Sequence, residues 1–120
     1  MPGPLAPPLP ALIAHYAAMP PVASMAPVVD DWRDGLLRLR APLAANVNDK
    51  GCAFGGSLNS LMTLSAWGLV FLELAQGGLA ADIFVADNRV RYLKPVFEDL
   101  VVEACFDDAG ERAALAAQLQ

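Results

Sequence analysis

The chain has 120 residues, which fits one domain, and its 56% hydrophobic and 18% charged residues supply enough apolar material for a packed core. Its formal net charge of −5 speaks against nucleic acid as the main partner, because phosphate binding requires a basic surface. One histidine and two distant cysteines, Cys52 and Cys105, exclude a typical zinc site, so no metal is expected. Reduced thiols and an N-terminus unlike a signal peptide predict a cytoplasmic protein.

Prolines dominate the N-terminal part of the chain. Residues 1–10 hold five of the ten prolines and are predicted to form an extended leader without a packed role. Ala11–Met19 is predicted to be a short helix that Pro20 and Pro21 end. Val22–Val29 is apolar but interrupted by a proline, which predicts a loop or an edge segment.

Gly35–Leu43 shows the alternation of a half-buried strand. Four apolar residues fall on one face and two arginines on the other: Leu37, Leu39, Ala41 and Leu43 against Arg38 and Arg40. The next residues, Ala44–Gly56, are rich in Asn, Asp and Gly and are predicted to be mostly loop.

Ser57–Ala75 is predicted to be the one long helix, with Gly77 and Gly78 as its stop signal. It is apolar on nearly all sides, so we expect it to be buried on nearly all sides. A membrane span is the alternative. Five polar residues interrupt the run, namely Asn59, Ser60, Thr63, Ser65 and Glu73. Together with the strands expected after it, they favour a core helix and no membrane span.

Two strands are predicted after the long helix. Ile83–Tyr92 and Leu100–Phe106 are rich in β-branched and aromatic residues, and Lys94–Asp99 would connect them. Glu111–Gln120 follows a glycine and is predicted to begin another helix. The order of elements indicates an α+β fold in which a sheet packs on one long helix.

The chemistry is concentrated in the loop before the long helix. Gly55 and Gly56 lead directly into that helix, so their N–H groups lie at the positive end of its dipole. Such a place can bind a phosphate or the oxyanion of an attacked carbonyl. The loop lacks the Lys and Ser/Thr of a P-loop, which favours the carbonyl. The alternative is that the two glycines only permit tight packing at a helix start.

The loop also resembles a known family. Asn48-x-x-Gly51-x-x-Phe54-Gly55-Gly56 is similar to the Asn-x-x-Gly-x-x-His-Gly-Gly signature of phenylacetyl-CoA-type hotdog thioesterases. The wider pattern resembles the YiiD C-terminal-domain family of thioesterases over about residues 11–107. The further matching positions are Asn46, Ser57-Leu58, Ala66-Trp67-Gly68 and Tyr92-Leu93-Lys94-Pro95-Val96.

The resemblance implies a hotdog fold, in which an antiparallel sheet wraps the long central helix. It also implies a homodimer or a dimer of dimers, with active sites between subunits and Ile83–Tyr92 near the dimer contact. A hotdog sheet has about five strands, and at most three are predicted here. We therefore expect residues 11–120 to form a single hotdog domain that is incomplete at its C-terminus.

The resemblance further implies the residues of the site. The N–H of Gly55, with that of Gly56, would hold a thioester carbonyl oxygen, and Asn48 would orient a water or the carbonyl. Two positions depart from the relatives: Phe54 replaces the histidine, and Thr63 replaces the helix carboxylate. The carboxylates left to activate water are Asp49, Asp87 and Glu73. The candidate catalytic residues are Asn48, Asp49, Gly55, Gly56 and Thr63, and the candidate substrate-binding residues are Asn46, Phe54, Ser57, Arg91 and Tyr92.

Two functions follow from this pattern. One is hydrolysis of acyl thioesters of coenzyme A or an acyl carrier, which enter as substrate, so that no separate cofactor is required. The other is a non-catalytic acyl-CoA- or lipid-binding module, because both expected catalytic groups are replaced. A dehydratase would need a histidine at the site, and the only one is His15. Arg89 and Arg91 share one face of the predicted strand, where they would meet coenzyme A phosphates or solvent.

Overall fold

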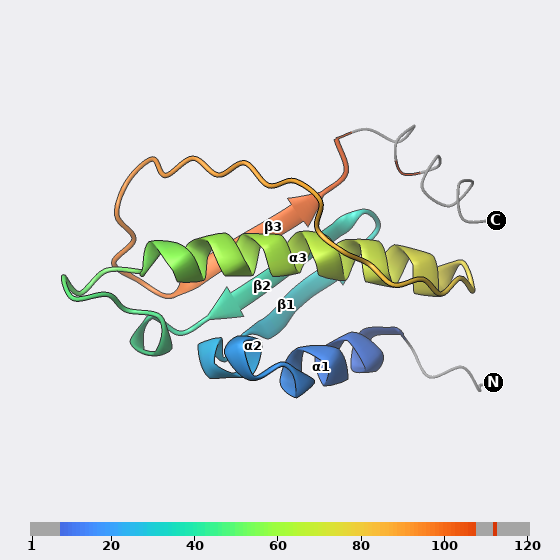
Figure 1. Cartoon of the computed structure of the whole chain (residues 1–120), viewed down its shortest axis with the longest axis horizontal. Coiled ribbons are helices and arrows are strands. Elements are labelled where there is room, and N and C mark those ends of the chain that lie inside the picture. Colours follow the sequence, from blue (N-terminus) through green and yellow to red (C-terminus); the bar gives the residue numbers. More distant parts are fainter. Residues whose placement is uncertain (1–7, 108–111, 113–120) are drawn as a thin grey trace.

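The computed structural model describes residues 8–107 and Arg112, and it shows helices packed on one face of a small antiparallel sheet (Figure 1). The elements, in chain order, are α1 (Pro8–Ala18), α2 (Pro20–Met25), β1 (Val28–Arg33), β2 (Leu36–Ala41), the short 3-10 helix η1 (Leu43–Ala45), α3 (Gly55–Gln76) and β3 (Leu100–Cys105). Helix α3 packs on β2 and β3, and α1 packs against α3. The core therefore lies between α3 and the sheet, with α1 covering one side.

β2 is the central strand and is antiparallel to both β1 and β3. The turn that joins β1 to β2 contains Gly35 with φ +72°, a backbone conformation that favours glycine. The alternation predicted for Gly35–Leu43 is confirmed in β2, since its inward side chains are buried: Leu37, Leu39 and Ala41. The strand is shorter than predicted because Pro42 follows it and Leu43 already belongs to η1.

The N-terminal residues are more helical than the sequence predicted. Pro8 begins α1, so the last part of the expected leader is the first turn of a helix, and Leu9 packs against the core. Pro20 begins α2 as well as following α1, because a proline fits the first turn of a helix, where its missing N–H is not needed. The predicted loop Val22–Val29 is wrong in its first half, which belongs to α2, and right in placing an edge segment in its second, where β1 begins.

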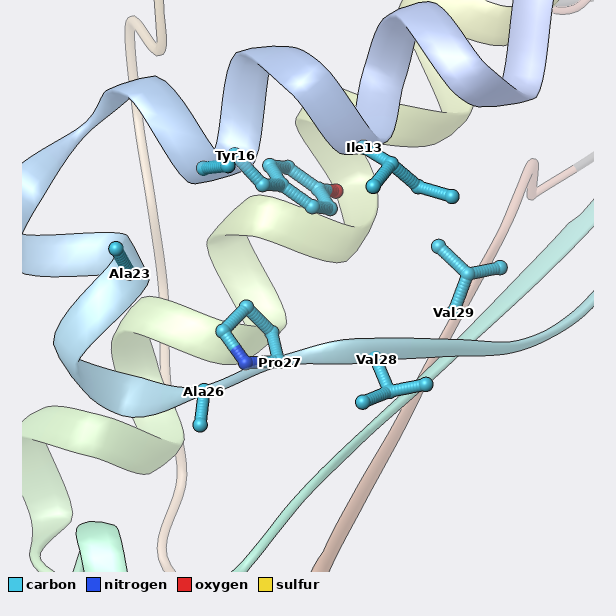
Figure 2. Close-up of a pocket in the computed structure, with 8 residues that line it drawn as sticks. Ile13, Tyr16, Ala23, Ala26, Pro27, Val28 and Val29 are labelled. Atoms are coloured by element: carbon cyan, nitrogen blue, oxygen red, sulfur yellow. The ribbon is translucent and has the colours of Figure 1, made fainter.

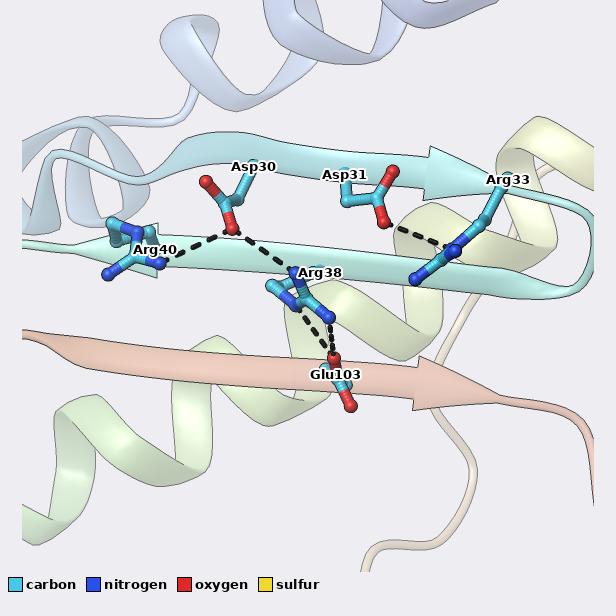
Figure 3. Close-up of polar contacts among 6 residues, drawn as sticks. All are labelled: Asp30, Asp31, Arg33, Arg38, Arg40 and Glu103. Carbon is cyan, nitrogen blue, oxygen red and sulfur yellow. Dashed lines mark hydrogen bonds and ion pairs between the residues drawn. The ribbon is translucent and has the colours of Figure 1, made fainter.

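Charged side chains cover the outer face of the sheet (Figure 3). Asp30 contacts Nη2 of Arg40 at 3.4 Å and Nη1 of Arg38 at 3.6 Å, and Arg38 pairs with Glu103 at 2.6 Å. The hydrogen bond from Arg40 is the largest of the effects that hold the pKa of Asp30 below its usual value. These arginines are already paired with carboxylates, so this face is not a free phosphate site.

Helix α3 begins two residues earlier than predicted, at Gly55, with Phe54 as its N-cap. Its buried side is continuous along the helix and comprises Ser57, Leu61, Ser65, Gly68, Leu69, Leu72 and Leu74. The expectation of burial on nearly all sides is wrong for this chain, because the three-stranded sheet and α1 cover only part of the helix. By length and composition α3 could cross a membrane. An open hydrogen-bonded sheet packs against it, however, and such sheets do not occur in the hydrocarbon of a bilayer.

Gly68 lets α1 approach α3 closely. A Cβ at this position would meet the Tyr16 hydroxyl and would lie 2.8 Å from a methyl group of Leu37. In that space the Tyr16 hydroxyl donates a hydrogen bond to the Leu64 carbonyl at 2.6 Å, and only 4% of Tyr16 is exposed. Burial raises the pKa of Tyr16 well above its ordinary value.

We expect alkaline pH to destabilise the protein through Tyr16. Its pKa is higher in the folded state than in the unfolded chain, so its contribution is complete below about pH 10 and is lost as the pH rises further. The free energy of unfolding should therefore fall by up to about 1.4 kcal/mol per pH unit above pH 10. Urea titrations of wild type and Tyr16→Phe between pH 8 and about pH 11.5 measure this. Equal slopes in the two proteins would exclude Tyr16 as the cause.

Residues 79–92, here called the strap, run back along α3 from its C-terminal end towards its N-terminal end (Figure 1). The predicted strand Ile83–Tyr92 is wrong, because no backbone ladder joins it to another strand among the described residues. High β propensity alone does not make a strand, which requires a hydrogen-bonded neighbour. The following prediction, Leu100–Phe106, is confirmed as β3, which pairs with β2.

Arg112 connects three parts of the chain. Its Nε lies 2.6 Å from Glu73 of α3, and its Nη1 lies 2.6 Å from Asp34 in the β1–β2 turn. The helix predicted for Glu111–Gln120 lies outside the described residues, apart from Arg112, and so do residues 1–7 of the predicted leader.

Candidate active site

The loop between η1 and α3 is held by two asparagines, and Asn46 is the inner one. Its Nδ2 donates to the carbonyl oxygens of Met25 and Pro42 at 3.0 and 2.8 Å. The backbone carbonyl of Asn46 accepts the Phe54 N–H at 2.7 Å. Asn46 is only 2% exposed, and its Oδ1 has no partner among the described residues. Asn46 therefore fixes the loop against α2 and places Phe54 directly before α3.

Asn48 closes the tip of the same loop. Its Oδ1 accepts the N–H groups of Lys50 and Cys52 at 2.7 and 3.2 Å, and its Nδ2 lies 3.2 Å from the Cys52 sulfur. Gly51, between them, has φ +81°, which the turn requires. Both polar atoms of Asn48 thus hold the loop together. Its predicted contact with a water or a carbonyl stays a prediction.

The start of α3 presents two backbone donors. Gly55 and Gly56 are the first two residues of the helix, and neither N–H has a backbone partner among the described residues, as expected for a first turn. The N-cap residue Phe54 forms no side-chain cap, so nothing from that side chain satisfies these groups. Ser57 is the buried residue of this turn, and its N–H already donates to the Phe54 carbonyl.

Phe54 and Tyr92 flank the glycine pair. The Phe54 ring is 55% exposed and covers Gly56 so closely that a Cβ there would lie 2.5 Å from the ring. The Tyr92 hydroxyl donates to the Gly55 carbonyl at 3.0 Å, with its ring 3.7 Å from where a Gly55 Cβ would be. Two aromatic rings therefore border the donors of the first turn, one from the loop and one from the strap.

Further along α3, Asn88 of the strap binds to two side chains of the helix. Its Nδ2 lies 2.6 Å from the Thr63 hydroxyl oxygen and 3.1 Å from Oδ1 of Asn59. Thr63 accepts this bond, so its own hydroxyl hydrogen remains available to another acceptor. Asn88 was not predicted as a site residue, since its one signal was an amide side chain within a stretch predicted to be a strand.

The three candidate carboxylates occupy different environments. Glu73 is engaged by Arg112 at 2.6 Å near the far end of α3. Asp49 lies at the loop tip with an 83% exposed side chain, 3.1 Å from Lys50. Asp87, in the strap, lines the same cavity as Thr63. Only Asp87 therefore shares a cavity with another predicted site residue.

That cavity, of about 520 Å³, lies between α3 and the strap and is called the strap cavity below. Thr63, Ala66 and Trp67 line it from the helix, and Asp87 and Arg89 from the strap. Arg91 does not line the strap cavity. Within the described part of the chain, neither Arg89 nor Arg91 forms an ion pair.

A separate apolar pocket of about 340 Å³ lies between α1, α2 and the start of β1 (Figure 2). Ile13, Tyr16 and Val29 point into it, and no candidate site residue lines it. It is therefore not part of the candidate active site.

Comparisons with known proteins agree with the fold and with the loop motif. Residues 14–120 match the YiiD_C family, described as "Putative thioesterase (yiiD_Cterm)". The crystal structure of a putative thioesterase from Shewanella oneidensis is 33% identical, over 83% of this chain and 74% of that one, with a TM-score of 0.78. A protein of unknown function from Chlorobaculum tepidum is 28% identical, over 88% of this chain and 65% of that one, with a TM-score of 0.83. The chain thus has a hotdog-type fold and belongs to the YiiD_C family of putative thioesterases.

Proposed function

We propose that this protein hydrolyses acyl thioesters of coenzyme A or of an acyl carrier. The observation that carries the proposal is the open first turn of α3, where the N–H groups of Gly55 and Gly56 have no backbone partner among the described residues. Donors of this kind stabilise the oxyanion that forms when water attacks a carbonyl carbon. The family and the similar thioesterase structure support the same chemistry.

In the proposed reaction Asp87 accepts a proton from water while the water oxygen attacks the thioester carbonyl carbon. The oxyanion is held by the first turn of α3, and its collapse breaks the carbon–sulfur bond. The thiolate leaves and takes up the proton, which releases a thiol and a carboxylic acid. Thr63 holds the water in this proposal, which its hydrogen bond from Asn88 supports, because that bond uses the Thr63 oxygen and leaves the hydroxyl hydrogen free. Asn48 acts as a positioning residue that shapes the loop.

The distance along α3 argues that one protomer does not supply the whole site. Thr63 lies eight residues after Gly55, which is about 12 Å of helix. A base must approach its water to about 3 Å, and the water must reach the carbonyl held by Gly55. We therefore propose a homodimer in which Gly55 of one protomer faces Asp87 and Thr63 of the other. The strap carries exposed apolar side chains suited to such a contact, with Phe84 85% exposed.

Hydrolysis of acyl-CoAs, followed by release of the free thiol, tests this function with a matched pair of variants. Asp87→Asn is expected to lower kcat by about 100-fold or more, as for loss of a general base. Asp49→Asn, an equally conservative change at the exposed loop tip, should leave kcat within about threefold of wild type, because that carboxylate is exposed and paired with Lys50.

The reverse result, with Asp49→Asn inactive and Asp87→Asn active, would transfer the role of base to the loop. Wild-type protein that binds acyl-CoA without any hydrolysis above background would show the non-catalytic binding module instead. Sedimentation velocity over a range of concentrations tests the dimer, and a monomer at all concentrations would exclude the shared site.

A further inference from the structure

One of the residues that line the strap cavity is a tryptophan of α3. Trp67 is half-buried, and its Nε1–H donates to the Ile83 carbonyl at 3.0 Å, so the indole is tied to the strap. Beyond it lies a second cavity of about 720 Å³, lined by residues from the end of α3, the start of the strap and His15 of α1. Trp67, Ile83 and Phe84 line both cavities, and they form the boundary between them.

The strap cavity has the properties of a site for a hydrocarbon chain. Its volume of about 520 Å³ lies within the usual range for small-molecule pockets. Apolar side chains line its inner part, including Ala66, Val70 and Ile83. Its polar residues are Thr63, Asp87, Asn88 and Arg89. Thr63 and Asn88 meet at one end along α3, and Trp67 lies towards the other. A molecule with one reactive polar end and an apolar tail matches this distribution.

We infer that the strap cavity binds the acyl chain of the substrate, and that Trp67 sets the chain length the protein accepts. This inference rests on the proposed function, because it places the thioester carbonyl beside Asp87 and Thr63. The chain then runs along α3 under the strap until it meets the indole of Trp67. The substrate class is therefore acyl thioesters of limited length.

The helix geometry gives an estimate of that length. Trp67 lies four residues after Thr63, which corresponds to about 6 Å along the axis. An extended polypeptide advances about 1.2 Å per bond, and a hydrocarbon zigzag is similar. The strap cavity thus accommodates about five to six carbons between Thr63 and the indole. Removing the indole would join the second cavity to the first and admit a longer chain.

Binding of S-alkyl-CoA thioethers tests the inference separately from hydrolysis, because a thioether cannot be hydrolysed. Calorimetric titrations with alkyl chains of two to sixteen carbons should show wild-type affinity rising to about six carbons and then no further. In Trp67→Ala the preferred length should increase by at least four carbons. The ratio of affinities for fourteen against six carbons should increase at least tenfold.

Two further variants keep the test decisive. Ala66→Leu places a larger side chain in the strap cavity at an exposed helix position, so it should fold. It should lower affinity for six carbons at least tenfold while sparing two carbons. Trp32→Phe lies on β1, outside both cavities, and should keep the wild-type profile. It also leaves Trp67 as the sole tryptophan, whose emission should respond only to chains long enough to reach it.

Unchanged length profiles in both Trp67→Ala and Ala66→Leu would overturn the inference, even if the protein hydrolyses thioesters. Altered profiles in a protein that hydrolyses no thioester would support the acyl site and refute the hydrolase. The two proposals therefore fail in different ways.

Discussion

Gly55→Pro is expected to lower kcat for thioester hydrolysis by about 100- to 1,000-fold, the usual effect of removing one oxyanion donor. Proline removes the N–H of Gly55 and nothing else that the fold requires. Gly55 is the first residue of α3, a position where proline is favoured in helices. Phe54, which precedes it, already has φ −65° and ψ 129°, the extended conformation that a following proline demands. The loss should therefore appear in activity and not in stability.

Gly55→Ala is the matched control, because it adds a side chain but keeps the N–H. Its Cβ would lie 3.7 Å from the Tyr92 ring, an ordinary contact, so the variant should fold and retain most of the wild-type rate. Circular dichroism and thermal melting of both variants verify the fold. A folded Gly55→Pro protein with more than about a third of the wild-type kcat would remove this N–H from the mechanism.

Mixing two inactive variants then tests where the base comes from. In a hybrid dimer of Gly55→Pro and Asp87→Asn chains, a shared site leaves one of the two sites fully wild type. Random exchange makes half of the dimers hybrids, so about a quarter of the wild-type activity should return. If each protomer supplied its own Gly55 and Asp87, every site would carry one defect and no activity would return.

Gly68→Ala is expected to destabilise the protein by about 1 to 3 kcal/mol, the usual cost of overfilling a packed core. The added methyl group would contact the Tyr16 hydroxyl and would lie 2.8 and 3.2 Å from methyl groups of Leu37 and Leu12. It would force α1 away from α3 and break the bond from Tyr16 to the Leu64 carbonyl. This loss exceeds the gain of up to about 1 kcal/mol that alanine brings to a helix.

Thermal and urea denaturation measure this effect, and the melting temperature should fall by about 5 to 15 °C. The same change in the Tyr16→Phe background should cost less, because the hydroxyl in closest contact is gone. Gly55→Ala, in the same helix but without a close contact, should not lower the melting temperature. An unchanged melting temperature in Gly68→Ala would show that α1 moves away at no cost.

The sequence pattern was enough to predict the elements whose formation depends mainly on their own residues. β2 was predicted from its alternation, whereas its partner β1 was not predicted as a strand, although one tight turn joins the two. Helix α3 was predicted to within two residues at its start, because its apolar run and its terminal glycines act locally. The prediction of a strand at Ile83–Tyr92 was wrong for the opposite reason. Its composition suits a strand, but strand formation depends on a hydrogen-bonded neighbour that the sequence pattern does not reveal.

The residues of the candidate site were likewise predicted only in part. Gly55 and Gly56 could be found from their order before a helix, since a first turn always leaves N–H groups open. The roles of Asn46 and Asn48 could not, because they depend on which backbone groups the loop brings to their amides. Trp67 stood in the family motif without a role, and only the position of the strap shows that it separates two cavities.

The way the strap is attached also determines how the site exchanges with solvent. No backbone–backbone hydrogen bond holds residues 80–92 among the described residues, and side-chain bonds at Ile83, Asn88 and Tyr92 hold the segment at three points. At about 1 kcal/mol for each point, detachment costs about 3 kcal/mol, so roughly one molecule in 150 is open at any moment. Such local opening leaves the sheet intact and occurs in microseconds to milliseconds. In the proposed site, an acyl tail can therefore enter the strap cavity from the side while the strap is detached.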